Sequence, residues 1–446
     1  MKYAIKITLL VSLLMITISA QCQTRKVFAH YMLNIGTRDN SSVEGFKQDV
    51  KEAIAGGVDG FAVNLAGWPP RYQQNMKNLV QAINEIDADF VFFFSFDKVV
   101  HMPDSVIIKV IKQYCNNKNY FRYNGRFFLS AWDPQGSAED WKFNVLLPLK
   151  KAGYDIYFVP YFAPNRKEMP TYDEDLSSVD RWKNTINGYF RFGPAGSPSY
   201  GSSSTSILKS GEEISKACHQ NGLTYMAQVS PLVFQSKKIP NGRPPRYYDY
   251  PGGEGIIAQW KSIIDVQRPE WVELVTWNDW DESTYFSPML NIEKYSIHVR
   301  HQENGFYKSH AGYAALNKYY IDWYKSGRQP AIQNDRIFYF YRTHPNNAVA
   351  PNDSIGKSLV KNGDIKDNLY VTVMLTTPAD LVIETGGTEK VFHVKQGISN
   401  IEFPFKPGAQ RFKLTRNGTV IMQGSGEDIV THINTYDMNY NSGVIQ

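Results

Sequence analysis

The sequence is short of cysteine, of membrane-spanning runs and of charge clusters. Three cysteines in 446 residues cannot supply a disulfide framework. Cys22 lies near the N-terminus, so Cys115 and Cys218 form either one bridge or two buried thiols, and we favour the thiols. The net charge is +5 and the basic residues are scattered, so nucleic acid is not an expected partner.

Several catalytic motifs are also absent. The nine histidines form no His-x-x-x-His or Cys-rich ligand spacing, and the acidic residues form no calcium loop, so neither a metal nor a cofactor is expected. No Gly-x-Ser-x-Gly elbow indicates an esterase. No Gly-rich phosphate loop follows the first predicted strand, which continues as residues 30–34, and this disfavours a doubly wound nucleotide-binding sheet.

Residues 1–20 have the order of a secretory signal: a basic start, an apolar run over residues 7–18, and Ser19-Ala20. The run of about 12 residues is shorter than the roughly 20 that span a bilayer, and no other candidate segment is found. We expect cleavage after Ala20 and a secreted or periplasmic protein without a transmembrane segment. A lipid anchor at Cys22 is the less favoured alternative, because Gln21 stands where a lipoprotein signal has a small residue.

Apolar, aromatic and β-branched runs alternate with amphipathic segments between residues 26 and 278. Helices are predicted over Val43–Ala55, with Ser41-Ser42 as a cap, and over Gln73–Ile86. The predicted parallel strands are Val27–Leu33, Gly60–Asn64, Phe90–Phe96, Phe127–Ala131, Tyr154–Pro160, Thr185–Phe190, Leu223–Val229 and Trp271–Trp277. Eight such alternations predict an α/β fold, a (β/α)8 TIM barrel of residues 21–330.

The composition changes after residue 330. Thr, Val, Ile and Gly alternate along Leu369–Leu375, Ala379–Glu384, Val391–Val394 and Arg411–Leu414. A C-terminal β-sandwich domain over residues 331–446 is expected.

Polar residues follow most of the predicted barrel strands, where barrel enzymes place their reactive groups. This ring consists of His30, Asn34, Asn64, Asp97, Asp133, Tyr161, Asn165, Gln228, Ser230, Asn278, Asp279, Asp281 and Glu282. Some members have structural alternatives: His30 as a core histidine, and Asp97 as a helix cap. Trp68, Trp132 and Tyr161 are candidates for stacking on sugar, although most of the 62 aromatic residues must be core.

The loop after the eighth strand carries three carboxylates in Thr276-Trp277-Asn278-Asp279-Trp280-Asp281-Glu282-Ser283. Hydrolysis of a glycosidic bond needs one carboxyl group as proton donor and a second to activate water or attack the sugar. Neighbouring aromatic and amide groups can raise one pKa and leave another low. The indoles are expected to stack on a pyranose, and Asn278 to hold hydroxyl groups. The structural alternative is a solvated strand cap.

Five collinear motifs resemble glycoside hydrolase family 71, the α-1,3-glucanases or mutanases. They are Val27-Phe28-Ala29-His30-Tyr31-Met32, Gly57-Val58-Asp59-Gly60-Phe61-Ala62-Val63-Asn64, Phe94-Ser95-Phe96-Asp97, Tyr225-Met226-Ala227-Gln228-Val229-Ser230-Pro231, and residues 275–283. The resemblance implies endo-cleavage of α-1,3-glucan with inversion, and Asp279 and Glu282 as the catalytic pair. We assign Glu282 as acid and Asp279 as base, with the reverse left open.

The sequence departs from the family pattern at two places, and both bear on which glycosidic linkage the protein cleaves. Asp281 stands where the family usually has Gly, and Trp132-Asp133 replaces a typical Phe-Glu pair. The Pro-, Arg- and Tyr-rich loop of residues 236–255 is also expected to change the cleft lining.

The expected partner is therefore a polysaccharide, and the protein is expected to be a monomer. Substrate contacts are predicted for His30, Asn64, Asp97, Trp132, Asp133, Tyr161, Gln228, Trp277, Asn278 and Asp281. A hydrolase acting on another α-linked polysaccharide such as mannan, or a barrel that binds carbohydrate without cleaving it, are the alternatives.

Overall fold

A computed structural model describes residues 25–37, 41–97, 102–162, 172–193, 206–236, 245–289, 307–351, 353, 359–362 and 365–446. The expected signal peptide, Cys22 and Asn165 lie outside these residues. Among the helices described, none is long and apolar enough to cross a membrane.

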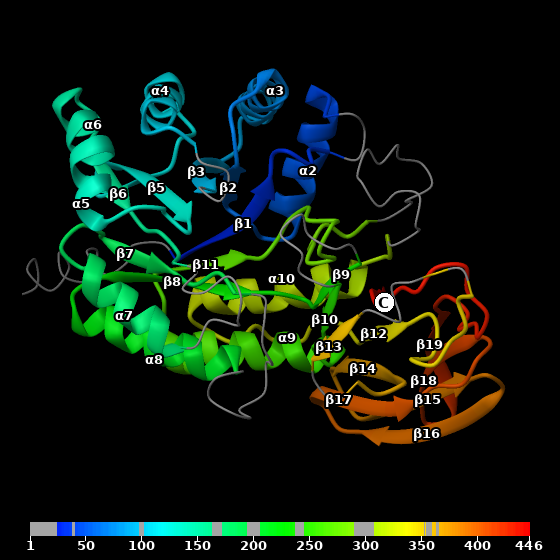
Figure 1. Ribbon diagram of the computed structural model, residues 1–446. Coiled ribbons are helices and arrows are strands. Elements are labelled where there is room, and N and C mark those ends of the chain that lie inside the picture. The colour runs from blue at the N-terminus through cyan, green and yellow to red at the C-terminus, as the bar shows by residue number, and fades with distance from the viewer. Residues whose placement is uncertain are drawn as a thin grey trace, which may run out of the picture.

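A curled parallel sheet forms the first part of the chain (Figure 1). Its strands are β1 (Lys26–Met32), β2 (Gly60–Leu65), β3 (Val91–Asp97), β5 (Arg126–Trp132), β6 (Ile156–Phe158), β7 (Gly188–Phe190), β8 (Thr224–Val229) and β11 (Trp271–Leu274). Pairing runs in the order β6-β5-β3-β2-β1-β11-β8-β7, and the short β4 (Arg122–Tyr123) adds an antiparallel arm to β5. All eight predicted strands are confirmed, with shifted ends.

The two outermost parallel strands, β6 and β7, also approach each other. Asn187 N donates to Phe158 O at 2.8 Å, and Phe190 N donates to Pro160 O at 2.9 Å. The curl of the sheet therefore brings the segments that contain β6 and β7, the two ends of the pairing order, within hydrogen-bonding distance.

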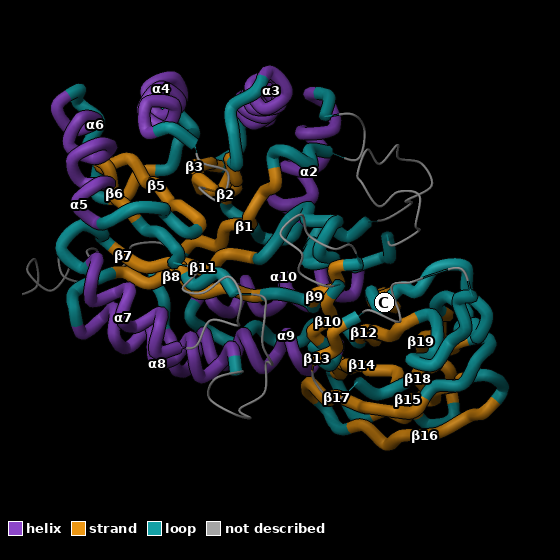
Figure 2. The backbone as a smooth tube through the Cα atoms, in the orientation of Figure 1, coloured by secondary structure: helices purple, strands orange, loops and turns teal. Residues whose placement is uncertain are grey.

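Helices surround this sheet on its outer side, as Figure 2 shows. They are α2 (Val43–Ala55), α3 (Pro70–Ile86), α4 (Asp104–Tyr114), α5 (Ala138–Trp141), α6 (Leu147–Lys151), α7 (Tyr172–Trp182), α8 (Ile207–Gln220), α9 (Gly252–Lys261) and α10 (Ala311–Ser326), with π-helical turns η2 (Lys142–Leu146) and η3 (Ser262–Gln267). The predicted bounds of α2 are confirmed, and its cap is Ser42, whose side chain accepts from Gly45 N.

The inner face of the sheet changes from aromatic to polar along the strands. Near the strand starts, ring centroids of Phe28 and Phe93 lie 5.0 Å apart, those of Phe93 and Phe128 4.7 Å, and those of Phe128 and Trp271 5.0 Å. Alternate strand residues share a face, so the residues two positions on point the same way. These are His30, Ser95, Ser130 and Glu273, all buried.

Two four-stranded antiparallel sheets form the C-terminal β region. One contains β12 (Arg336–Arg342), β14 (Asn368–Leu375), β17 (Gly397–Pro404) and β20 (Tyr440–Ile445); the other contains β15 (Ala379–Thr385), β16 (Thr388–Val394), β18 (Gln410–Arg416) and β19 (Thr419–Ser425). Alternating apolar residues of both sheets make one shared core. The four predicted C-terminal strands are confirmed as β14, β15, β16 and β18 of these two sheets.

A third, three-stranded sheet joins the two parts of the chain. Its strands are β9 (Val233–Gln235) and β10 (Arg246–Tyr248), which follow β8, and β13 (Val360–Asn362) from the C-terminal β region. Strand β10 pairs antiparallel with β9 and parallel with β13. A segment beside the parallel sheet is therefore bonded directly to the C-terminal β region.

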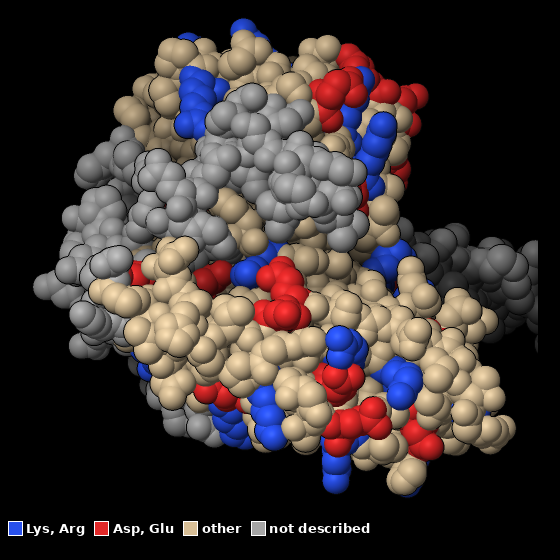
Figure 3. Space-filling view, turned by 90° about the vertical axis from the view of Figure 1, so that its right-hand side faces the viewer, with Lys and Arg blue, Asp and Glu red and all other residues tan. Residues whose placement is uncertain are grey.

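Cys115 and Cys218 are free, buried thiols, as predicted. On the surface, acidic and basic side chains are interspersed across the face that Figure 3 shows.

Candidate active site

The loop after β11 is attached to the end of β1 by its own side chains. Asn278 Oδ1 accepts from Met32 N at 2.7 Å, and Asn278 Nδ2 donates to Met32 O at 3.2 Å and Gly36 O at 2.9 Å. Trp277 N donates to His30 O at 2.7 Å. Asn278 thus uses its amide to fix the loop, and its predicted contact with sugar remains a prediction.

Asp279 occupies a tight turn of this loop. Its backbone N donates to Thr276 Oγ1 at 2.8 Å, and its Oδ1 accepts from Glu282 N at 3.0 Å. The side chain is only 7% exposed. Burial, followed by the nearby charges of Glu282 and Asp281, raises the pKa of Asp279 well above its ordinary range.

Glu282 lies in a different environment only three residues away. Its side chain is 22% exposed, and Arg246 Nη2 donates to its Oε1 at 2.8 Å. Its backbone carbonyl accepts from Phe234 N at 2.8 Å. One carboxyl group is thus desolvated beside like charges, whereas the other has a cationic partner.

The two tryptophans of the loop support it from within. Trp277 is buried and its ring lies 5.7 Å from that of Phe61. Trp280 is also buried, in edge-on contact with Tyr285 at 4.9 Å. These indoles therefore contribute packing within the protein, and their stacking on sugar remains a prediction.

An aromatic group lies at the ends of β5 and β6. The ring of Trp132 is partly exposed, 5.9 Å from the ring of Tyr161 and 6.1 Å from that of Phe192. Asp133 N donates to Tyr161 O at 2.8 Å, and the φ of Asp133 is +49°. The structure thus brings together three predicted substrate-binding residues, Trp132, Asp133 and Tyr161.

On the inner face of the sheet, three buried side chains lie in a row, each within hydrogen-bonding distance of the next. His30 Nδ1 lies 2.6 Å from Glu273 Oε1, and His30 Nε2 lies 3.1 Å from Asn64 Nδ2. Burial raises the pKa of Glu273, and the hydrogen bond to His30 opposes that shift. Glu273 Oε2 and Asn64 Oδ1 are buried and have no hydrogen-bond partner among the residues that the structure describes.

The other predicted positions are more scattered. Gln228 exchanges two hydrogen bonds with Gly193, at 2.8 and 2.6 Å, and so fixes the chain after β7. Ser230 is held through its backbone by Gln259. Asp97 ends β3 and is partly buried, whereas Trp68 packs against Tyr114 of α4.

Sequence reasoning missed three residues of the site: Thr276, Glu273 and Arg246. Glu273 is a carboxylate in an otherwise apolar strand, and the alternation that turns Trp271 inward could have placed it. Arg246 lies in the Arg- and Tyr-rich loop that the sequence singled out, but nothing local indicates its contact with Glu282. In the described part of the chain, no group of three or more His, Cys, Asp or Glu side chains could hold a metal ion.

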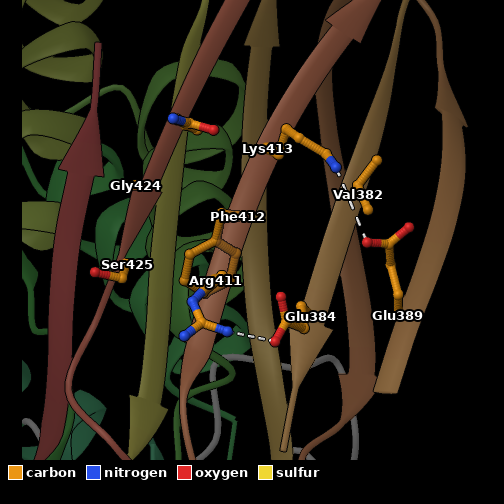
Figure 4. Close-up of a pocket in the computed structure, with 9 residues that line it drawn as sticks. Val382, Glu384, Glu389, Arg411, Phe412, Lys413, Gly424 and Ser425 are labelled. Atoms are coloured by element: carbon orange, nitrogen blue, oxygen red, sulfur yellow. Dashed lines mark hydrogen bonds and ion pairs between the residues drawn. The ribbon is translucent and has the colours of Figure 1, made fainter. Parts of the chain in front are cut away.

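A separate hollow of about 440 Å³ lies on the outer face of the sheet of β15, β16, β18 and β19 (Figure 4). Its acidic residues pair with bases: Arg411 Nη1 lies 2.5 Å from Glu384 Oε1, and Lys413 Nζ lies 3.9 Å from Glu389 Oε2. The ring of Phe412, which also lines it, is buried. With its charges paired and this ring covered, the hollow offers neither an uncompensated acid nor a stacking surface.

Known proteins resemble this chain in sequence. The sequence model of glycosyl hydrolase family 71 matches residues 23–446. A glucan endo-1,3-α-glucosidase of Schizosaccharomyces pombe is 27% identical over 94% of this chain and 95% of its own. A mutanase of Penicillium rubens is 26% identical over 94% of this chain and 88% of its own.

A solved structure resembles the fold. The endo-α-mannosidase of family 99 from Bacteroides thetaiotaomicron superposes with a TM-score of 0.50 at 11% identity, over 68% of this chain and 98% of that chain. At this identity the likeness concerns the fold alone.

Proposed function

Because the chain belongs to glycosyl hydrolase family 71, we propose that it is an endo-α-1,3-glucanase in which Asp279 and Glu282 are the two catalytic carboxyl groups. The named relatives, a glucan endo-1,3-α-glucosidase and a mutanase, align with more than nine-tenths of the chain at 26–27% identity. They support the substrate class, α-1,3-linked glucan.

The observation that carries the catalytic assignment is the unequal environment of two carboxyl groups in one loop. Asp279 is buried beside like charges and Glu282 is bonded to a guanidinium. A glycosidase needs such a pair to hold one proton between them, since one group must give a proton while the other takes one. A raised pKa suits either task, because it keeps a donor protonated and makes a base stronger.

The proposed reaction inverts the anomeric carbon in one displacement. One carboxyl group protonates the glycosidic oxygen, the bond from the anomeric carbon to that oxygen breaks, and the leaving chain departs as an alcohol. The other carboxylate takes a proton from the attacking water, whose oxygen bonds to the anomeric carbon from the opposite face. The Asp281 charge raises the pKa of Asp279 further, which distinguishes this loop from a Gly-containing one.

Substrate binding is proposed at the ends of the neighbouring strands. Trp132 offers aromatic surface, packed against the buried ring of Tyr161, and Asp133 and Asp97 offer hydroxyl acceptors. The surface is supported from below by His30, Asn64, Gln228, Trp277 and Asn278.

We further propose that the curled sheet closes into a (β/α)8 barrel over residues 21–330, followed by a β-sandwich domain over residues 331–446. The hydrogen bonds between β6 and β7 and the shared core of the two C-terminal sheets support these assignments.

We also propose that residues 1–20 direct secretion. N-terminal sequencing of the protein recovered outside the cytoplasm, starting at Gln21, would support this; an uncleaved N-terminus would contradict it.

The function is tested with wild type, Asp279→Asn and Glu282→Gln on α-1,3-glucan, with reducing ends counted and their anomeric form resolved. We expect wild type to release inverted, β-configured products, and each variant to lose about 10²- to 10⁴-fold in kcat. Asp87→Asn and Glu44→Gln, which change exposed carboxylates on the helical side, serve as matched controls. Full activity in either site variant would remove that residue from its role.

The same variants assign the roles. An α-1,3-glucooligosaccharide with a fluoride leaving group needs no proton donor, so the variant that lacks the acid recovers on it and the variant that lacks the base does not. Release of sugar only from another α-linked polysaccharide such as mannan would favour a different substrate. Binding of α-1,3-glucan without release would indicate a non-catalytic barrel.

A further inference from the structure

The β9–β10 hairpin holds Glu282 at two points. Phe234 N, in β9, donates to Glu282 O, and Arg246 Nη2, in β10, donates to Glu282 Oε1, both at 2.8 Å. Phe234 and Tyr247 face each other in the antiparallel pair, as do Gln235 and Arg246. A displacement of β10 would therefore move the two contacts together.

The C-terminal β region in turn holds β10. The β10–β13 pairing aligns Arg246 with Val360. Tyr247 Oη, next to Arg246, donates to Asp249 Oδ1 at 2.7 Å, and Tyr440 Oη of β20 donates to the same oxygen at 2.6 Å. Strands β13 and β20 of the C-terminal β region thus both contact β10 or the residues that directly follow it.

A buried arginine completes this group. Arg342 Nη1 of β12 donates to Tyr247 Oη at 3.4 Å, and Arg342 Nη2 donates to Asp367 Oδ1 at 3.0 Å. We call Tyr247, Asp249, Arg342 and Tyr440 the anchor cluster; each of them is no more than 7% exposed. Charged groups removed from water depend on their fixed partners, so such a cluster tolerates little displacement.

Resting on the proposed function, we propose that the C-terminal β region is part of the catalytic apparatus. The anchor cluster fixes β10 so that Arg246, a positioning residue, holds the Glu282 carboxylate in its working orientation. Arg246 of β10 forms an ion pair with Glu282, and the charge of Glu282 in turn acts on Asp279 of the same loop.

Two substitutions test Arg246 itself. Arg246→Gln should lower kcat on α-1,3-glucan at least tenfold with KM within about twofold, because a bound substrate does not replace the missing guanidinium. Arg246→Lys should recover part of kcat, because its ammonium group restores the positive charge but not the guanidinium geometry. Wild-type kcat in Arg246→Gln would overturn the positioning role.

A third substitution tests the distant anchor. Tyr440→Phe removes one hydroxyl hydrogen bond to Asp249 and retains the ring. Its control, Tyr341→Phe, removes a hydroxyl hydrogen bond to Glu427 O from the same sheet, outside the cluster. We expect Tyr440→Phe to lower kcat threefold or more and to speed amide exchange at Phe234, with Tyr341→Phe close to wild type in both. Equal effects of the two substitutions would overturn the anchor.

Different results would refute the proposed function and the inference about the anchor cluster. Amide exchange at Phe234 needs no substrate, so it tests the anchor whichever glycan the wild type cleaves. Loss of activity in Asp279→Asn and Glu282→Gln, together with normal Arg246→Gln and Tyr440→Phe, would refute this inference and leave the proposed function intact. A wild type inactive on α-1,3-glucan would refute the proposed function, while exchange at Phe234 would still decide the anchor.

Discussion

Replacing Asp437 by Asn should stabilise the protein near pH 8 and change little near pH 4. Asp437 is buried and linked to the segment after β11: its Oδ1 accepts from Asn439 N at 2.8 Å, and Asn439 Nδ2 donates to Tyr285 Oη at 2.8 Å. The ring of Tyr285 packs on Trp280. Burial raises the pKa of Asp437 to about 7, against an ordinary value of 3.8, and the charge of Lys308 opposes this shift.

The magnitude follows from this pKa difference. The folded protein binds the Asp437 proton more tightly than the unfolded chain, so the stability contributed by this group is full below about pH 4. It is lost as the pH rises through the interval from about 4 to 7. A difference of about three pKa units corresponds to about 4 kcal/mol. In a chain of this length, 4 kcal/mol shifts Tm by roughly 4 °C.

The assay is thermal unfolding of wild type and Asp437→Asn at half-unit steps between pH 4 and pH 8. The difference in Tm should grow from near zero to roughly 4 °C in favour of the variant. A constant difference across this range would show that the charge of Asp437 is not responsible. A wild type that is the more stable form at pH 8 would mean that the carboxylate has a stabilising partner.

Two further predictions concern the loop attachment and the thiols. Asn278→Ala removes three hydrogen bonds between the loop after β11 and the segment at the end of β1, so it should lower the free energy of unfolding by about 2–4 kcal/mol and reduce kcat; an unchanged denaturant midpoint would contradict this. Burial raises the pKa of Cys115 to about 12 and that of Cys218 further, so peptide mapping should find neither labelled by a thiol reagent at pH 8 until urea is added. Rapid labelling of either in the native protein would refute their burial.

The strands could be predicted from the sequence because burial on both faces leaves continuous apolar runs. Phe90–Phe96 and Trp271–Trp277 are near-continuous apolar runs, interrupted only by Ser95 in the first and by Glu273 and Thr276 in the second, and the observed strands differ from them mainly at their ends. The apolar residues of Leu369–Leu375 likewise identified a strand that is buried along its whole length, with Leu369, Val371, Val373 and Leu375 in the core shared by the two C-terminal sheets. These signals are local, and a single sequence contains them.

The candidate site was only partly predictable, because its details depend on contacts between distant segments. The carboxylates of the eighth loop could be identified from residue types and from the family resemblance. By contrast, the contact of Arg246 with Glu282 joins residues 36 apart, and Asn278 reaches Met32 over 246 residues. The burial of Trp277 could not be foreseen either, since a loop indole has the same local sequence whether it faces solvent or core.

The attachment of β1 to both β2 and β11 affects how the protein can be synthesised. The first strand finds its second neighbour only after about three-fifths of the chain has left the ribosome, when Trp271 is available. Until then one edge of β1 has open backbone donors and acceptors, and such edges attract foreign strands. A nascent chain should therefore depend most on a chaperone when translation pauses shortly before Trp271.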